Sequence, residues 1–190
     1  MVKVECKPLQ LIILVAMSFL FALSIDNMAY SAGSADNAYS VEVESALTVN
    51  VSANSVTLRL NPASKPFDYG DLDVTVTTNH ITGYKLTMDS ASTSLIEEND
   101  SSLTIPTLAD LAGGYTDESF TTNRWGYKVG TTGNYISFAS GSKIASSNGP
   151  ISNDTTTVRF AAKIDGTQAS GTYSDTLSFM ATVNPLTPSS

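Results

Sequence analysis

The sequence predicts an all-β fold, a single antiparallel β-sandwich of about seven to nine strands that follows an N-terminal signal helix. Apolar and polar residues alternate with a period of two from residue 39 onward, which is the side-chain period of a half-buried strand. The alternating runs recur at intervals of roughly 8–20 residues and are separated by Gly, Asn, Asp, Ser and Pro, the residues that favour turns. No stretch of this part of the chain carries the apolar stripe of an amphipathic helix.

Each expected strand is marked by apolar residues of one parity. In FDYGDLDVTV, for example, Leu72, Val74 and Val76 alternate with aspartates and threonines that would face solvent. Residues 90–122 lack this periodicity and predict an excursion from the sheets, with one helical turn at 107–112. The strands are expected at residues 41–51, 56–60, 72–76, 84–88, 125–129, 136–138, 158–164 and 177–183.

The N-terminus has the layout of a secretory signal peptide. Its apolar run, residues 9–23, is shorter than the roughly twenty residues that a membrane span needs. Ala29 and Ser31 supply the small residues of a cleavage site, and cleavage there releases a mature chain that begins at Ala32. The alternative is that the segment stays as an uncleaved anchor. We expect a signal peptide at 1–31, a flexible N-terminus at 32–38, the sandwich domain at 39–184 and a disordered Pro/Thr/Ser tail at 185–190.

The composition argues against several classes of function. The 190-residue chain has 10 Lys+Arg against 18 Asp+Glu, a net charge of −8, which disfavours binding to nucleic acid or to anionic lipid. The single cysteine, Cys6, lies in the expected signal peptide, so the mature domain would be cysteine-free, as is typical of bacterial export. The single histidine, His80, lies in a turn, and no nucleophile elbow accompanies it. We therefore expect no enzyme and no cofactor.

Three stretches together resemble a broad group of secreted bacterial cell-surface proteins. They are VTTNHITGYKLTM (76–88), NRWGYKVG (123–130) and TTTVRFAAKIDGTQASGTYSDTLSFMATVNP (155–185), which match the patterns T-T-N-x-x-x-G-Y, W-G-Y and G-T-Y-x-D. The resemblance covers residues 46–185. It implies an immunoglobulin-like or pilin-like Greek-key sandwich displayed outside the cell, and it carries no catalytic residues.

The residues of these stretches also have structural explanations. Gly83 and Gly171 precede strands where the backbone needs a positive φ or a close approach to another segment. Tyr84 and Tyr173 follow them, where a ring can cover the edge of the core while its hydroxyl reaches a backbone carbonyl. Trp125 is expected in the core, the alternative being a ligand-binding aromatic.

Asp68, Asp71 and Asp73 form the densest acidic cluster beside a turn, which makes them weak candidates for a calcium site. Asp71 and Asp73 alternate with apolar residues, and the spacing does not match a twelve-residue calcium loop. The competing interpretation is a solvated strand edge whose charge discourages pairing with other edges. No other metal site is expected.

Tyr115, Phe120, Tyr135 and Phe138 are the aromatic residues that could bind a ligand. Carbohydrate- and cell-wall-binding modules present exposed rings on one face, so exposure of these four would favour such a module and burial would favour a structural role.

The alternating run 41–51, VEVESALTVNV, has two possible roles. It is either the first strand of the domain itself or a donor strand that completes the sheet of a neighbouring molecule.

Taken together, these features predict a non-catalytic, exported protein at the bacterial cell surface, with a structural or adhesive role in a surface layer, matrix or pilus-like assembly. Its partners would be other surface proteins or further copies of itself, with cell-wall or host glycans as the alternative and no nucleic acid or membrane after signal cleavage. A secreted hydrolase is the remaining alternative, and it would need two converging carboxylates.

Overall fold

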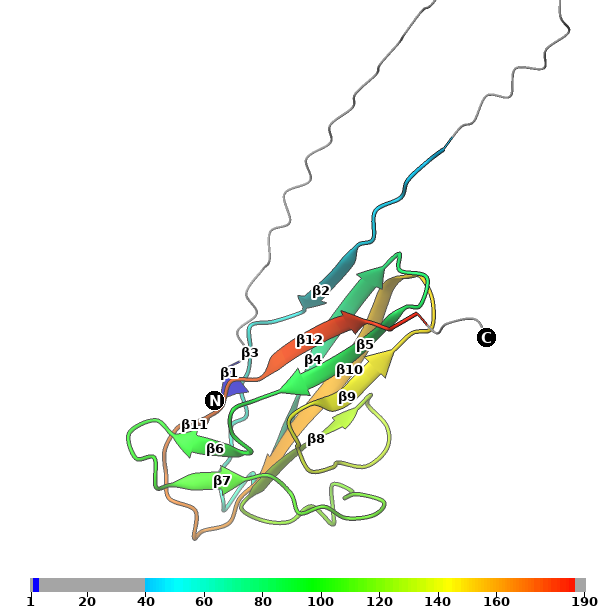
Figure 1. The fold of residues 1–190 in the computed structure, drawn as a ribbon. Helices are drawn as coiled ribbons and strands as arrows, with labels where there is room; N and C mark the ends of the chain where they lie inside the picture. Colours follow the sequence, from blue (N-terminus) through cyan, green and yellow to red (C-terminus); the bar gives the residue numbers. More distant parts are fainter. Residues whose placement is uncertain (1, 4–39, 187–190) are drawn as a thin grey trace, which may run out of the picture. The chain divides into compact units, whose positions relative to one another are not determined.

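The computed structural model describes residues 2–3 and 40–186 and shows an all-β protein (Figure 1). Every ladder between its strands is antiparallel, and the described residues contain no helix, so none that could cross a membrane. The strands are β1 (Val2–Lys3), β2 (Leu47–Val51), β3 (Ser55–Val56), β4 (Phe67–Thr78), β5 (Tyr84–Asp89), β6 (Ser94–Glu97), β7 (Thr104–Pro106), β8 (Arg124–Val129), β9 (Ser142–Ser146), β10 (Ile151–Lys163), β11 (Tyr173–Ser174) and β12 (Ser178–Val183).

The chain divides into two compact units, Met1–Cys6 with Ser45–Ser190, and Lys7–Glu44. Of the second unit the structure describes only residues 40–44, which form no regular element. The predicted signal peptide apart from residues 2–3, the predicted flexible segment 32–38 and the end of the predicted tail lie outside the described residues.

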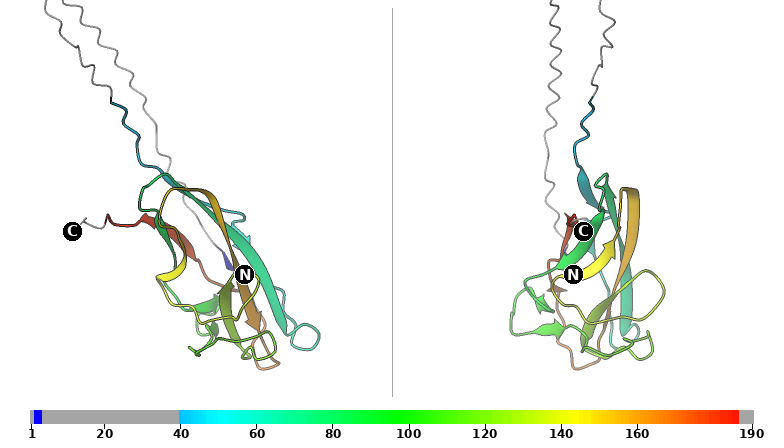
Figure 2. Two further views of the ribbon diagram at one scale, coloured as in Figure 1. Left: turned by 90° about the vertical axis from the view of Figure 1, so that its right-hand side faces the viewer. Right: turned by 45° about the vertical axis from the view of Figure 1, so that its right-hand side comes forward.

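Two layers of sheet face each other in the first unit (Figures 1 and 2). One layer is a four-stranded sheet in the order β2-β4-β10-β8. The other layer consists of two three-stranded sheets, β12-β5-β9 and β11-β6-β7. Because β12 pairs with β5 and β11 pairs with β6, the segments 84–97 and 173–183 run antiparallel to each other through both of these sheets.

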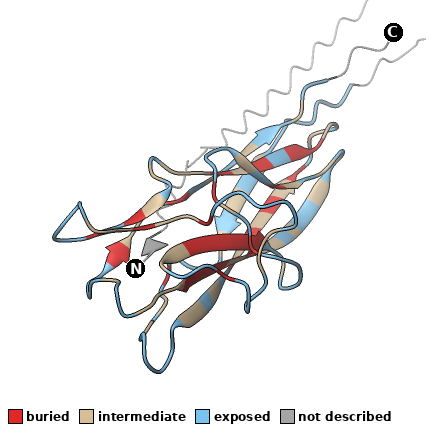
Figure 3. Ribbon diagram, turned by 90° about the horizontal axis from the view of Figure 1, so that it is seen from below, coloured by how far each residue is buried: buried red, intermediate tan, exposed pale blue. Residues whose placement is uncertain are grey.

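The core lies between the layers, and strands of both layers line it (Figure 3). β4 shows why: Leu72, Val74 and Val76 are fully buried, and Asp71 and Asp73 on the other parity are not. Trp125 and Tyr84, the largest fully buried side chains, enter this core from β8 and β5. The alternation read from the sequence is therefore confirmed as the division between core and solvent.

Several predicted element boundaries are wrong. β6, β7 and β9 were not expected, because their buried residues are too few to make a clear alternating run. The predicted helical turn at 107–112 is absent, because Thr107 forms a bridge with Trp125 and Leu108 donates its N–H to the Trp125 carbonyl at 2.7 Å. Residues 136–138 form only one bridge, between Ile136 and Tyr127, and no strand.

The N-terminal alternating runs form less sheet than predicted. Of residues 41–51 only Leu47–Val51 pairs, as β2 against β4. Of the expected strand 56–60 only Val56 is part of a strand, in β3. Short strands such as β3 and β11 bring the total among the described residues above the predicted seven to nine.

Candidate functional site

The three aspartates proposed for calcium lie in or beside the outer face of the four-stranded sheet, each with a different partner. Asp71 accepts two hydrogen bonds from the Arg159 guanidinium, at 2.6 and 2.8 Å, and these bonds lower the pKa of its carboxyl group. The Thr157 hydroxyl donates to Asp73 at 2.6 Å.

Asp68 lies at the start of β4 and makes an ion pair of 2.7 Å with the ammonium of Lys65. Its carboxylate also accepts the backbone N–H of Arg59 at 2.8 Å. Within the described residues, no three His, Cys, Asp or Glu side chains lie close enough to hold a metal ion. The aspartates therefore support cross-strand contacts and a turn.

Cations and aromatic rings alternate on the same face. The Arg159 guanidinium lies 4.1 Å from the centre of the Tyr69 ring, and the Lys128 ammonium lies 4.4 Å from the centre of the Tyr135 ring. Both distances fall within the range of cation–π contacts. Tyr69 is 47% exposed, which makes it the one aromatic ring of this face that is open to solvent among the described residues.

The aromatic residues proposed for ligand binding lie mostly inside the protein. Phe120, Tyr135 and Phe138 are buried, and Tyr115 is half-buried. Phe120 and Tyr135 meet edge to face, with ring centres 5.2 Å apart, in a small second core over the outer side of the four-stranded sheet. Phe138 packs on Trp125 in the main core, with ring centres 5.5 Å apart. These rings fix the long loops between β7 and β9 onto the sheet and form no exposed platform for a sugar.

Burial also changes the chemistry of Tyr135, whose phenol pKa it raises to about 12. This hydroxyl therefore stays protonated into more alkaline solution than that of an exposed tyrosine.

The structure places the glycines and tyrosines of the stretches 76–88 and 155–185 largely as predicted. Gly83 has a φ of 74°, and a Cβ there would lie 2.4 Å from the Ser147 carbonyl oxygen. Gly171 has no positive φ and is required by close approach, since its Cβ would lie 2.7 Å from the Glu97 side chain. The Tyr173 hydroxyl donates to the Ala169 carbonyl at 2.8 Å, the expected corner contact.

Two side chains of these stretches have partners that the sequence did not indicate. The Tyr84 hydroxyl bonds to the Asp154 carboxylate and not to a backbone carbonyl, which corrects the prediction. Trp125 is 2% exposed and donates its indole N–H to the Thr93 carbonyl at 3.0 Å.

His80 is used by the turn in which it lies. Its Nδ1 is 2.8 Å from the Thr82 hydroxyl, and that hydroxyl in turn donates to the Asn184 carbonyl. This arrangement holds the β4–β5 turn against the end of β12, and it contains no carboxylate that would orient the imidazole for catalysis.

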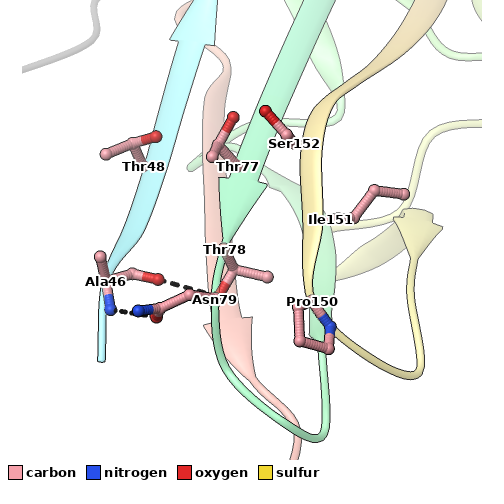
Figure 4. A pocket seen from close by; sticks show the side chains of 8 residues that line it. All are labelled: Ala46, Thr48, Thr77, Thr78, Asn79, Pro150, Ile151 and Ser152. Carbon is pink, nitrogen blue, oxygen red and sulfur yellow. Dashed lines mark hydrogen bonds between the residues drawn. The ribbon is translucent and has the colours of Figure 1, made fainter. Parts of the chain in front are cut away.

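Two hollows open on the surface. The first, of about 400 Å³, lies where β2 begins, β4 ends and β10 begins (Figure 4). A hydrogen bond of 2.7 Å from the Ala46 N–H to the Asn79 side chain closes one side of it, and a bond of 2.9 Å from the Thr78 hydroxyl to the Ala46 carbonyl lies beside that bond. Its lining residues carry no charge, so it offers shape but no catalytic group. The lining residues are Ala46, Thr48, Thr77, Thr78, Asn79, Pro150, Ile151 and Ser152.

The second hollow, of about 570 Å³, is a groove between the extended segment 57–62 and the segment 168–173 that leads into β11. We call it the β3–β11 groove. Leu95, Ile105 and Ala162 form its floor, and all three are buried core residues. The sequence signal for one wall of the groove is the alternating run at 56–60, which ends at the turn-forming Asn61-Pro62.

No protein-family model matches this chain, and neither does any curated protein. The function is therefore argued from the fold and from these surfaces.

Proposed function

We propose that this protein is an exported, non-catalytic component of the bacterial cell surface, an immunoglobulin-like or pilin-like sandwich with a structural or adhesive role. The observation that carries the proposal is that the candidate catalytic side chains are bonded inside the domain, whereas apolar surfaces remain accessible. The polar side chains considered above as catalytic or metal-binding candidates, Asp68, Asp71, Asp73 and His80, bond within the domain. Exposed apolar side chains on the edge strand β12 and a largely apolar groove remain available for association. Association through backbone edges needs no special side chains.

The edge strand β12 supports this proposal. Among the described strands it pairs only with β5, it lies close to β2 without pairing to it, and its residues Met180 and Val183 are 55% and 42% exposed. Soluble monomers usually protect such edges with charge, proline or a covering segment, because an open edge invites pairing with another chain. β12 contains no charged residue.

Cell fractionation with a tag placed after Ser190, followed by electron microscopy of the surface material, tests the proposal. Tagged protein in the surface fraction, in fibres, a lattice or a matrix, is the expected result. Tagged protein that is found only inside the cell, or only as a free monomer in the medium, would contradict it.

A carbohydrate- or cell-wall-binding module is the second candidate. Tyr69 favours it, because its exposed ring lies over Arg159 on an open sheet face, and an aromatic ring with a cation behind it can stack on a sugar. A pull-down on cell-wall and host glycans that is abolished by Tyr69→Ala would support this candidate, whereas binding unaffected by that substitution would remove Tyr69 as its site.

A further inference from the structure

The β3–β11 groove has the dimensions and the chemistry of a missing strand. Leu58 and Leu60 point toward its apolar interior from one wall, and Tyr173 from the other. Thr57, Leu58 and Leu60 make no backbone hydrogen bond to any other described residue. An extended wall with unused N–H and C=O groups beside an apolar floor is the arrangement that accepts an added strand.

The structure itself shows that a strand fits at this edge. β1 pairs antiparallel with β3, with Val2 opposite Val56 and Lys3 opposite Ser55, and it also lies beside β11. β1 belongs to the predicted signal peptide. Removal of that peptide would leave the edge of β3 without a partner.

The chain also contains a segment suited to fill the groove. Residues 40–46 precede β2 and form no regular element, and Val41 and Val43 are 68% and 78% exposed. Their odd parity puts both valines on one face of an extended strand, with Glu42 and Glu44 on the other. Exposed apolar side chains in such an alternating pattern gain free energy when that face becomes buried.

We propose that the β3–β11 groove binds residues 40–44 of a second copy of this chain, so that successive molecules associate by strand addition, while Ala46 stays bonded to Thr78 and Asn79 of its own domain. This inference rests on the proposed structural role and identifies the surface that would carry it. Val41 and Val43 of the donor enter beside Leu58 and Leu60, and Glu42 lies on the outer side beside Arg59 of the acceptor. Arg59 is the one charged residue that lines the groove among the described residues, so the charges of donor and acceptor are complementary.

The donor segment is also long enough to reach a neighbour. Residues 40–44 span at most about 17 Å when extended, at about 3.3 Å per residue. When residues 40–44 bind the neighbour, Ala46 and β2 stay bonded to β4 and to Asn79 in the donor's own domain. The donor domain therefore keeps its four-stranded sheet intact.

The test uses the protein that an exporting host produces from the full-length gene, with its N-terminus determined by intact mass. Light scattering compares the wild type with the double variant Val41→Asp/Val43→Asp and with the control Ile81→Asp. Ile81 is likewise an exposed aliphatic residue, at 74%, and it belongs neither to the residues that line the groove nor to residues 40–46. We expect oligomers of the wild type and of the control, and a monomer of the double variant.

A synthetic peptide of residues 40–46 tests the acceptor without altering its fold. We expect it to bind the monomeric double variant and to slow amide exchange at residues 55–60. A peptide carrying the same two aspartates should bind at least about tenfold more weakly, since it would place two charges against an apolar floor.

Three results would overturn the inference: a monomeric wild type, a double variant that assembles like the wild type, or a peptide that leaves exchange at 55–60 unchanged. Ordered surface material formed by the double variant in cells would refute strand addition and leave the proposed surface role standing. Absence of the wild type from the surface would refute that role, whatever the purified protein does.

Discussion

The side chain of Asn184 provides the sharpest stability prediction, because one amide joins three parts of the chain. Its Nδ2 donates to the carbonyls of Thr82 and Ser147, both at 2.8 Å, and lies 3.4 Å from the Tyr84 carbonyl. The β4–β5 turn, the loop between β9 and β10 and the end of β12 therefore meet at this residue. Substitution by alanine removes both short bonds and leaves two carbonyls with one partner fewer.

Each of these bonds contributes about 1 kcal/mol to the free energy of unfolding, so we expect Asn184→Ala to lose about 2 kcal/mol. For a domain of this size that loss corresponds to a decrease in Tm of roughly 4–8 °C. Asn184→Asp should cost more, because it directs a carboxylate at carbonyl oxygens. Asn50, which is exposed on β2 and makes no side-chain hydrogen bond to another described residue, supplies the control. Asn50→Ala should change stability by less than about 0.5 kcal/mol.

Urea unfolding followed by tryptophan fluorescence measures these values. Trp125 is the single tryptophan of the chain and is 2% exposed, so its emission reports loss of the core directly. An Asn184→Ala variant that unfolds within about 0.5 kcal/mol of the wild type, with an unchanged m-value, would refute the reasoning. The three carbonyls would then be satisfied equally well by water.

Three further predictions concern backbone geometry and titration. Gly83→Ala should destabilise by at least about 2 kcal/mol, because its Cβ would combine a positive φ with a clash against the Ser147 carbonyl. Gly113→Ala shares a positive φ but meets no atom within 4 Å, so it should cost only about 1 kcal/mol. Equal costs of the two variants in urea unfolding would contradict this. Because Arg159 lowers the pKa of Asp71, their pair stabilises above the usual aspartate pKa and this contribution is lost as the pH falls through the lowered value. The stability difference between the wild type and Asp71→Asn should therefore vanish in acid, and a difference independent of pH would refute the assignment. Burial raises the pKa of Asp175, so ionisation of this carboxyl group opposes folding as the pH rises. The Asp175→Asn variant should therefore gain stability relative to the wild type between acid and neutral pH. An opposite trend in pH-dependent melting would refute this prediction.

The sequence predicted the long strands well because each of them separates core from solvent. In β4, β5 and β10 every second side chain packs between the layers and most of the others face outward. Apolar and polar residues therefore alternate with a period of two in their sequences. β8 departs from this rule, since Gly126 and Lys128 are buried as well as Trp125 and Tyr127. Loops cover its outer face, and the sequence of β8 itself contains no pattern that predicts this burial.

The short elements could not be predicted, because their residues are determined by distant partners. Leu95 and Ile105 are the single buried apolar residues of β6 and β7, and they lie opposite each other in the ladder between these strands. The same holds for the candidate site. The alternating residues at 56–60 were visible in the sequence. The groove beside them exists only because the segment 168–173 crosses the core opposite them. That crossing is a property of the topology, which one sequence does not reveal.

The pairing order of the strands has a consequence for how the protein is made. β4 pairs with β10, which begins about seventy residues after β4 ends. β5 pairs with β12, the last strand of the domain. Few native contacts are available to the first half of the chain while it is being synthesised, and folding dominated by such distant contacts is slow. If the protein is exported as proposed, a chain that cannot close its core until its last strand has emerged would reach the membrane before its folding is complete. The same topology that delays folding inside the cell would allow it to be completed outside.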